Sequence, residues 1–250
     1  MSYGVFSDFY DALTANVEYA AVAKTICSLL TREGIDRGLL LDLGCGTGTL
    51  SVLLSKAGYE VVGADRSPDM LSVAQGKAFE AGQNILLLCQ DMQELDLYGT
   101  VDAAVCTLDA LNHLPDRAAV ETVLRRVALF LNPNGVFIFD TNTLYKHREI
   151  LGNNTFIYDT DEVYCVWQND LQADNRTVEI SLDFFIPDEG DEPFYERASE
   201  QFSERAYTQD EWREMLSAAG FSVLSVLDGY ADAPLGEASE RAVYVVRKEK

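Results

Sequence analysis

The stretch LLLDLGCGTGTL, from Leu39 to Leu50, constrains the fold most strongly. A short apolar run ends in a glycine-rich segment, and an apolar pattern with helical spacing resumes after it. A buried strand followed directly by a helix gives this pattern. Gly44, Gly46 and Gly48 remove side chains from the turn, so a ligand can approach backbone N–H groups and the start of the helix. The stretch therefore predicts a strand, a ligand-binding turn and a helix.

The same order of strand and helix repeats along the chain. Apolar runs predict strands buried on both faces over 39–43, 60–64, 85–89, 101–106 and 136–140. Helical spacing predicts helices over 49–57, 68–81 and 116–131, and further helical segments over 7–13 and 17–30. Repeated units of this kind predict an α/β fold in which helices cover a parallel sheet.

A different sequence pattern begins after the fifth predicted strand. Strands are predicted over 163–170, 176–186 and 194–207, and the middle one alternates apolar and polar residues. Such alternation is typical of an antiparallel sheet with one wet face. A helix over 209–219 and strands over 221–228 and 241–247 then complete the first sheet. We expect an N-terminal core over 1–145, an inserted antiparallel β lid over 146–206, and a return to the core over 207–250.

Composition narrows the possible partners. The chain has 250 residues, of which 48% are hydrophobic, enough for one large core. Its formal charge of −22 makes a nucleic-acid footprint improbable, because that requires basic side chains facing phosphates. The charge suits a cationic small molecule or a basic protein partner, although a solvated surface that keeps the protein soluble is the stronger interpretation. The sequence contains no run of eighteen apolar residues that could span a membrane, so we expect a cytoplasmic protein. We also expect it to be a monomer or a homodimer.

Cysteine and histidine usage argues against a metal centre. The five cysteines form no CxxC pair, and there are only two histidines. A structural zinc site needs several such ligands at short spacing, so we expect reduced thiols and no metal. His147 lies outside any motif and is expected at the surface.

The glycine loop differs from that of dinucleotide-binding folds. Their G-x-G-x-x-G pattern requires a glycine where this chain has Thr49, since Gly48 comes one residue earlier. An acid at the end of the second strand, Asp65, can accept hydrogen bonds from ribose hydroxyls, and Asp91 follows the third strand. Each acid also has a purely structural interpretation: Asp42 and Asp91 as caps, and Asp65 as a charge at a helix N-terminus.

In order, the segments LDLGCGTG, GADRSPDML and CQDM resemble the class I S-adenosylmethionine-dependent methyltransferases. The resemblance implies a Rossmann-like sheet, mostly parallel with an antiparallel last strand, and S-adenosylmethionine as cofactor. It also implies that Asp65 holds the ribose, that Met70, Asp91 and Met92 surround the adenine, and that Asp42 orients the amino-acid end. The full set of implied cofactor-binding residues is Tyr19, Asp42, Gly44, Cys45, Gly46, Gly48, Asp65, Arg66, Met70, Asp91, Met92 and Leu108.

The N-terminal helices and the insertion resemble the small-molecule branch of this class, which includes aminosugar N,N-dimethyltransferases and glycine N-methyltransferase. The whole chain is most similar to the YqeM-like bacterial group. This resemblance implies transfer of a methyl group to a small molecule, such as an amine. A non-catalytic S-adenosylmethionine-binding module and, less favoured, a nicotinamide-dependent oxidoreductase are the alternatives.

The acceptor end of the site rests on fewer signals. Tyr10 is placed near the sulfonium by the resemblance, and the segment CTLDALNHL offers Asp109 and His113 to hold or deprotonate an acceptor. Asn112 and Trp167 are candidate substrate-binding residues. Three of these residues also have an ordinary structural interpretation. Tyr10 and Trp167 can be packing aromatics, and the His113 side chain can simply bond to the backbone.

Overall fold

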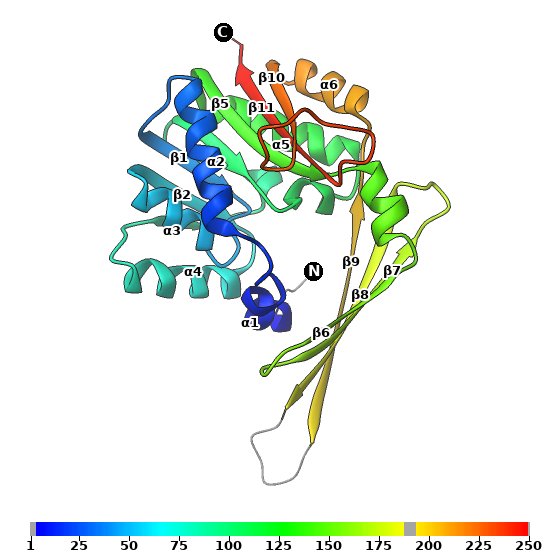
Figure 1. Cartoon of the computed structure of the whole chain (residues 1–250). Helices are drawn as coiled ribbons and strands as arrows, with labels where there is room; N and C mark the ends of the chain where they lie inside the picture. Colours follow the sequence, from blue (N-terminus) through cyan, green and yellow to red (C-terminus); the bar gives the residue numbers. More distant parts are fainter. Residues whose placement is uncertain (1–3, 188–193, 250) are drawn as a thin grey trace.

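A computed structural model describes residues 4–187 and 194–249 of the chain (Figure 1). Its larger sheet has seven strands in the order β10-β11-β5-β4-β1-β2-β3, and β11 runs antiparallel to both of its neighbours. This confirms the predicted α/β fold with an antiparallel last strand. The strands are β1 (Gly38–Leu43), β2 (Tyr59–Asp65), β3 (Leu86–Cys89), β4 (Val101–Cys106), β5 (Leu131–Asn142), β10 (Phe221–Asp228) and β11 (Arg241–Lys248).

Helices bury both faces of this sheet. Leu40 packs with residues of α2 and α3, whereas its neighbour Leu41 packs with residues of α5 and α6 on the other face. Each large apolar side chain buried in this way contributes about 1.5–3 kcal/mol. The helices are α1 (Gly4–Leu13), α2 (Tyr19–Arg32), α3 (Thr49–Lys56), α4 (Pro68–Glu80), α5 (Arg117–Phe130) and α6 (Gln209–Ala218), with short turns η1 (Met92–Glu94), η2 (Ala110–His113) and η3 (Lys146–Leu151).

The predicted insertion forms a separate antiparallel sheet that reaches away from the core beside α1 (Figure 1). Alternate side chains of its third strand are buried, as the sequence pattern predicts. Phe6 and Leu13 of α1 join the apolar cluster of this sheet, so α1 lies between the insertion and the core. The strands are β6 (Thr155–Asp159), β7 (Tyr164–Leu171), β8 (Thr177–Pro187) and β9 (Tyr195–Arg205).

Four local predictions are wrong. The strand over 85–89 was expected to be buried on both faces, but β3 lies at the edge of the sheet and none of its residues is buried. The strand β6 was not predicted, because its five residues bury no side chain fully and give little apolar signal. The strand β5 begins at Leu131 rather than Val136, directly after α5. His147 is not at the surface: η3 carries it beneath the second sheet, where it is 0% exposed and its Nδ1 donates to the Arg176 carbonyl. The division into 1–145, 146–206 and 207–250 stays a prediction.

None of the helices in the described part of the chain has the length and apolar character that crossing a bilayer requires.

Candidate active site

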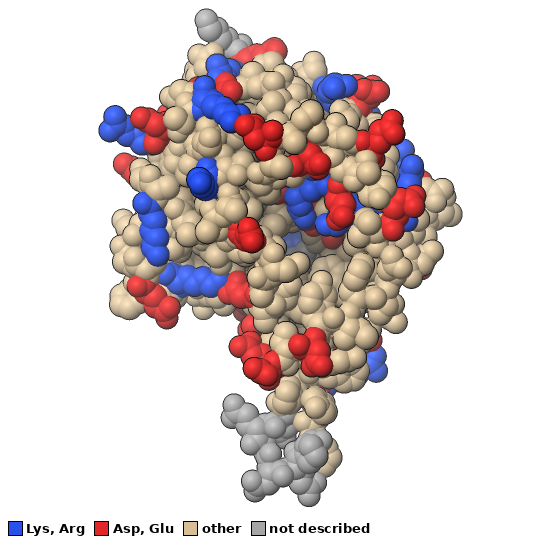
Figure 2. Space-filling view, viewed as in Figure 1, with Lys and Arg blue, Asp and Glu red and all other residues tan. Residues whose placement is uncertain are grey.

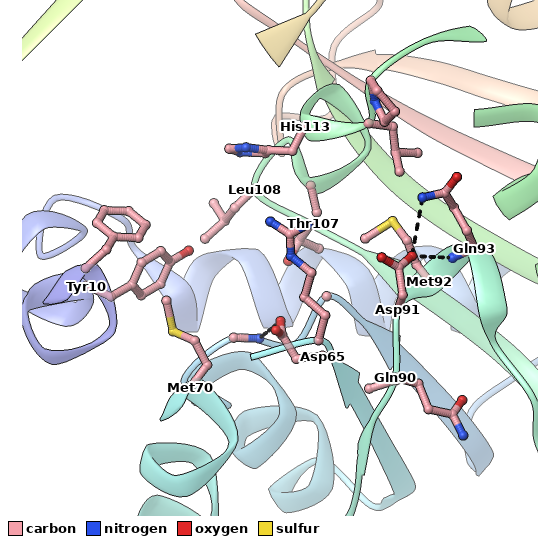
Figure 3. A pocket seen from close by; sticks show the side chains of 18 residues that line it. Tyr10, Asp65, Met70, Gln90, Asp91, Met92, Gln93, Thr107, Leu108 and His113 are labelled. Carbon is pink, nitrogen blue, oxygen red and sulfur yellow. Dashed lines mark hydrogen bonds between the residues drawn. The ribbon is translucent and has the colours of Figure 1, made fainter. Parts of the chain in front are cut away.

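A cavity opens at the carboxyl ends of β1, β2 and β4, where ligands of open parallel sheets bind. Tyr10 and Leu108 lie at one end of it, and Asp91 and Gln93 lie at the other (Figure 3). Ten of the predicted site residues line this cavity: Tyr10, Gly44, Gly46, Asp65, Arg66, Met70, Asp91, Met92, Leu108 and His113. A small adjoining pocket shares Tyr10, Gly44 and Leu108 and adds Tyr19, Asp42 and Cys45.

Two glycines of the loop, Gly46 and Gly48, have different tasks. Gly46 has φ +52°, and a Cβ placed on it would point into open space. Gly48 has φ +75° and precedes α3, and a Cβ there would lie 2.7 Å from the Ala74 side chain of α4. Gly46 therefore leaves room within the cavity, whereas Gly48 allows two helices to approach and does not line the cavity.

Asp65 connects the glycine loop to the start of α4. Its Oδ2 accepts the N–H of Gly46 at 2.9 Å, and its Oδ1 accepts the N–H of Ser67 at the same distance. A carboxylate oxygen can accept more than one hydrogen bond, so both oxygens can still serve a ligand. Asp65 thus shapes the loop and lines the cavity.

Asp91 also combines a structural and a ligand-facing position. Its Oδ1 accepts the N–H of Gln93 at 2.8 Å and caps the turn η1, which is the structural interpretation of the sequence. It nevertheless lines the cavity together with Met92. The cap orients the carboxylate and leaves Oδ2 without a hydrogen bond to any described residue.

Asp42 is a buried carboxylate without a basic partner in the described chain. It is 1% exposed, and its Oδ2 accepts from the Ser51 hydroxyl at 2.5 Å. Burial, with a smaller contribution from nearby Asp65, raises the pKa of Asp42 to about 6, although the Ser51 bond lowers it. Burial makes the ionised form of Asp42 unfavourable in the free protein. A cationic ligand group in the small pocket beside it would stabilise that form.

We predict that Asp42→Asn stabilises the free protein at pH 8 by about 1–3 kcal/mol, since each pKa unit corresponds to about 1.4 kcal/mol. A raised folded-state pKa gives stability that is full below about pH 4 and falls as the pH rises through about 6. Asparagine can still accept from Ser51 and does not ionise. Urea unfolding at about pH 4.5, 6 and 8 measures the difference, and an unchanged pH dependence in the variant would contradict the assignment.

Polar contacts hold α1 over the loop. Asp11 accepts from the Thr47 hydroxyl at 2.8 Å and pairs with Lys77 at 2.5 Å. This fixes the helix that carries Tyr10 to the cavity. Burial, followed by the nearby Tyr19, raises the pKa of the Tyr10 phenol well above its usual value. Tyr10 is therefore a neutral hydroxyl, suited to donate a hydrogen bond rather than to take up a proton.

The loop after β4 is held in a strained conformation. Leu108 and Asp109 have φ values of 54° and 52°, which residues other than glycine adopt at a cost. Their N–H groups donate to the two oxygens of Asp140, at 2.9 and 2.8 Å. Arg241 and Tyr230 also bind the Asp140 carboxylate. This buried cluster sets the position of the loop that carries His113.

Asp109 is firmly ionised. Its Oδ1 lies 2.5 Å from Arg241, and its Oδ2 lies 3.9 Å from His113 Nε2. Burial alone would raise its pKa, but Arg241, Lys146 and His113 together lower the pKa to about 2. Asp109 itself does not line the main cavity and stands behind His113. It therefore acts as a fixed negative charge beside His113 and not as a proton acceptor.

Two predicted substrate residues lie away from the cavity. Asn112 is 0% exposed, and its side chain donates to the Arg205 carbonyl and accepts from the N–H of Asn142. Trp167 packs in the second sheet, and its indole N–H donates to Asn169. Asn112 thus joins the core to the insertion, and contact of either residue with a substrate stays a prediction.

Other side chains of the site carry no strong sequence signal. Arg241 and Glu204 meet the η2 loop from β11 and β9, far along the chain. The only hint for Glu204 is a charged residue in the buried register of β9, two positions after Phe202. The unpredicted residues that line the main cavity are Phe6, Ala64, Gln90, Gln93, Thr107, Ala110, Leu114 and Pro115.

One face of the molecule shows how its charges are distributed. On the face in Figure 2, acidic side chains stand beside most of the basic ones, so no continuous basic surface forms there. Proteins that bind along the phosphates of a nucleic acid need a continuous basic surface.

Comparisons with known proteins place this chain in a family. The family described as "Methyltransferase domain" matches residues 40–135. The Bacillus subtilis (strain 168) protein named "Putative methyltransferase YqeM" is 33% identical over 251 residues, covering 100% of this chain and 98% of its own. The crystal structure of an S-adenosylmethionine-dependent methyltransferase from Clostridium acetobutylicum is 32% identical, with a TM-score of 0.88 and 99% of each chain covered.

A more distant structure has the same fold. It is CalS10 with bound S-adenosylmethionine, an amino pentose methyltransferase from Micromonospora echinaspora, at 21% identity and a TM-score of 0.76. The match covers 99% of this chain and 98% of that chain.

The residues of the cavity fit S-adenosylmethionine. Gly46 leaves space against the loop, and Asp65 keeps free acceptor positions for hydroxyl groups. Met70 and Leu108 line the cavity with apolar surface, and the buried Asp42 carboxylate lines the small adjoining pocket, where its charge would suit an ammonium group. The chain belongs to the YqeM-like class I S-adenosylmethionine-dependent methyltransferases.

Proposed function

We propose that this methyltransferase acts on a small-molecule acceptor, with an amine as the preferred class. One observation carries the proposal: His113 and Tyr10 line the same cavity as the loop and the acids suited to the cofactor. A donor and an acceptor bound in this cavity would be close together, and proximity with orientation supplies much of the rate enhancement of a displacement reaction.

The chain's own residues would bind and orient the cofactor. We propose that Asp65 binds the ribose hydroxyls, that Asp91 and Met92 lie against the adenine, and that Asp42 pairs with the amino group. Bound S-adenosylmethionine supplies a methyl group already activated on a sulfonium. The remaining task of the protein is to hold the two reactants in line and to keep water out.

At the acceptor end, we propose that Tyr10 and Phe6 of α1 close the cavity and that Tyr10 donates a hydrogen bond. An ammonium acceptor must lose a proton before it attacks, and His113 is the candidate to take it. Asp109, ionised and 3.9 Å from His113 Nε2, would stabilise the imidazolium that forms. The rate should therefore rise with pH as the amine loses its proton.

Charge supports the choice of an amine. The net charge of −22 attracts cations and repels polyanions. The amino pentose methyltransferase with the same fold adds support, since an amino sugar is a small amine.

Two measurements test the proposal. Calorimetry with S-adenosylmethionine, S-adenosylhomocysteine and NAD should show binding of the first two alone, and binding of NAD alone would favour an oxidoreductase. Labelled cofactor is then incubated with separate pools of small metabolites, protein and RNA. Label in the small-molecule pool supports the proposal, label in RNA alone contradicts it, and binding without any transfer favours a non-catalytic module.

Asp65→Asn is expected to weaken S-adenosylmethionine binding by about 1–2 kcal/mol, because a charge-assisted hydrogen bond to the ribose becomes a neutral one. Asparagine is preferred to alanine because its oxygen can still accept the N–H of Gly46 and keep the loop in place. Calorimetry measures the affinity, and circular dichroism checks the fold. Wild-type affinity in the folded variant would remove Asp65 from the ribose site.

A further inference from the structure

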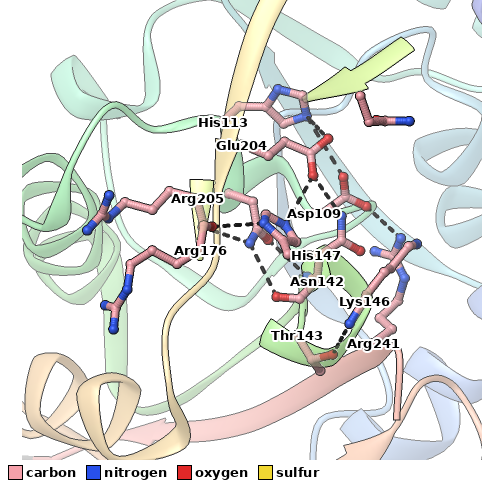
Figure 4. A network of polar contacts seen from close by, with 12 residues as sticks. Asp109, His113, Asn142, Thr143, Lys146, His147, Arg176, Glu204, Arg205 and Arg241 are labelled. Atoms are coloured by element: carbon pink, nitrogen blue, oxygen red, sulfur yellow. Dashed lines mark hydrogen bonds and ion pairs between the residues drawn. The ribbon is translucent and has the colours of Figure 1, made fainter. Parts of the chain in front are cut away.

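Two side chains of the η2 loop, Asp109 and His113, and a distant one from β9, Glu204, point ligand atoms at one another (Figure 4). His113 Nε2 lies 3.9 Å from Asp109 Oδ2 and 3.8 Å from Glu204 Oε1. These distances are too long for hydrogen bonds. They are slightly wider than the roughly 3.4 Å between two ligands of a tetrahedral ion with bonds of about 2.1 Å.

The carboxylate of Glu204 directs one oxygen toward His113. The Glu204 side chain is only 4% exposed, yet Oε1 makes no hydrogen bond to any described residue and faces His113. Because Glu204 is almost wholly buried, water stabilises the charge of its carboxylate little, and a cation beside Oε1 would lower that cost.

The second oxygen of each carboxylate is already committed. Asp109 Oδ1 binds Arg241, and Glu204 Oε2 accepts from the Asn142 amide at 2.8 Å. His147 Nε2 lies 3.6 Å from the same Glu204 oxygen, beyond hydrogen-bond distance. Hydrogen bonds such as those from Arg241 and Asn142 orient the ligands of protein-bound metals, and here they leave one oxygen of each acid facing inward.

We propose that Asp109, His113 and Glu204 bind a divalent first-row transition ion such as Mn²⁺, Co²⁺ or Zn²⁺. One imidazole and two carboxylates suit these ions, whereas Mg²⁺ prefers oxygen ligands and retained water. The described residues supply three protein ligands, so the ion keeps open positions for water. The expectation of no metal rested on the absence of a CxxC pair and on there being only two histidines. It did not consider Glu204, which belongs to the insertion and has no motif spacing to His113.

The ion changes the task of His113. A nucleophile bound to a metal loses its proton more readily, and Nε2 cannot both bind the ion and take up that proton. His113 would then be a ligand rather than the base. Binding of the ion itself does not rest on the proposed methyl transfer, so the two can fail separately.

Metal binding tests the site directly. The full-length protein, stripped with chelator and dialysed, is titrated with Mn²⁺, Co²⁺, Zn²⁺ and Mg²⁺ by calorimetry. We expect one transition ion per chain and much weaker Mg²⁺ binding. Failure of all three transition ions to bind below about 1 mM would overturn the proposal.

Matched variants locate the ion. Glu204→Gln and His113→Ala should each weaken transition-metal binding at least tenfold, and Glu196→Gln, an exposed residue on the same strand, should not. Asp65→Asn should retain the metal while losing affinity for the cofactor. If Glu204→Gln does not fold, His113→Ala tests the site instead. The His113 side chain is partly exposed, so its removal should disturb the fold less. Wild-type metal affinity in folded His113→Ala would overturn the site.

Discussion

Arg241→Met is expected to lower the free energy of unfolding by about 3 kcal/mol, because it leaves two acids without their cation. Arg241 is one-fifth exposed and pairs with both Asp109 and Asp140. Breaking a buried pair from one side typically costs about 3–5 kcal/mol, and partial exposure places this case at the low end. Urea unfolding at pH 7 measures the loss.

A surface pair provides the control. Arg197 binds Asp183 with its own side chain 62% exposed, so Arg197→Met should change the unfolding free energy little. If both variants lose the same free energy of unfolding, the pairing of Arg241 with Asp109 and Asp140 contributes nothing specific. Arg241 would then stabilise the fold only through the packing of its side chain or through the net charge.

The same substitution should remove an acid-dependent part of the stability. The pKa of Asp109 is lowered to about 2 in the folded chain, so its contribution is present above the ordinary value of about 3.9. In the wild type, it is lost as the pH falls from about 4 to about 2. Arg241→Met should unfold with a weaker pH dependence over that interval.

The elements of the core could be predicted because their signals are local. Each strand of the larger sheet apart from β3 and β10 buries most of its side chains, and each helix repeats its apolar residues within a few turns. The residues at the strand ends follow from the same pattern, since carboxyl ends of parallel strands share one edge. Ten predicted site residues consequently meet in one cavity.

What could not be predicted depends on contacts between distant segments. The partners of Asp109 and His113 come from β11 and β9, and no spacing in the sequence relates them. His147 is buried because the second sheet covers η3, which its own neighbours do not indicate. Similarly, the motif does not distinguish the glycine that faces a ligand from the one that faces a helix. Only the position of Ala74 beside Gly48 makes that distinction.

Gly46→Val is therefore expected to weaken S-adenosylmethionine binding more than 100-fold. The φ of +52° strains a branched residue, and its side chain would extend into the cavity. Gly82→Val separates the two effects, since Gly82 has φ +65° and open space around it but lies at the exposed end of α4. Both variants should lose stability by about 1–2 kcal/mol from backbone strain. Calorimetry at a temperature where both are folded should find near wild-type affinity in Gly82→Val alone. Equal loss of affinity in both would attribute the effect to strain, and normal binding by Gly46→Val would place the cofactor elsewhere.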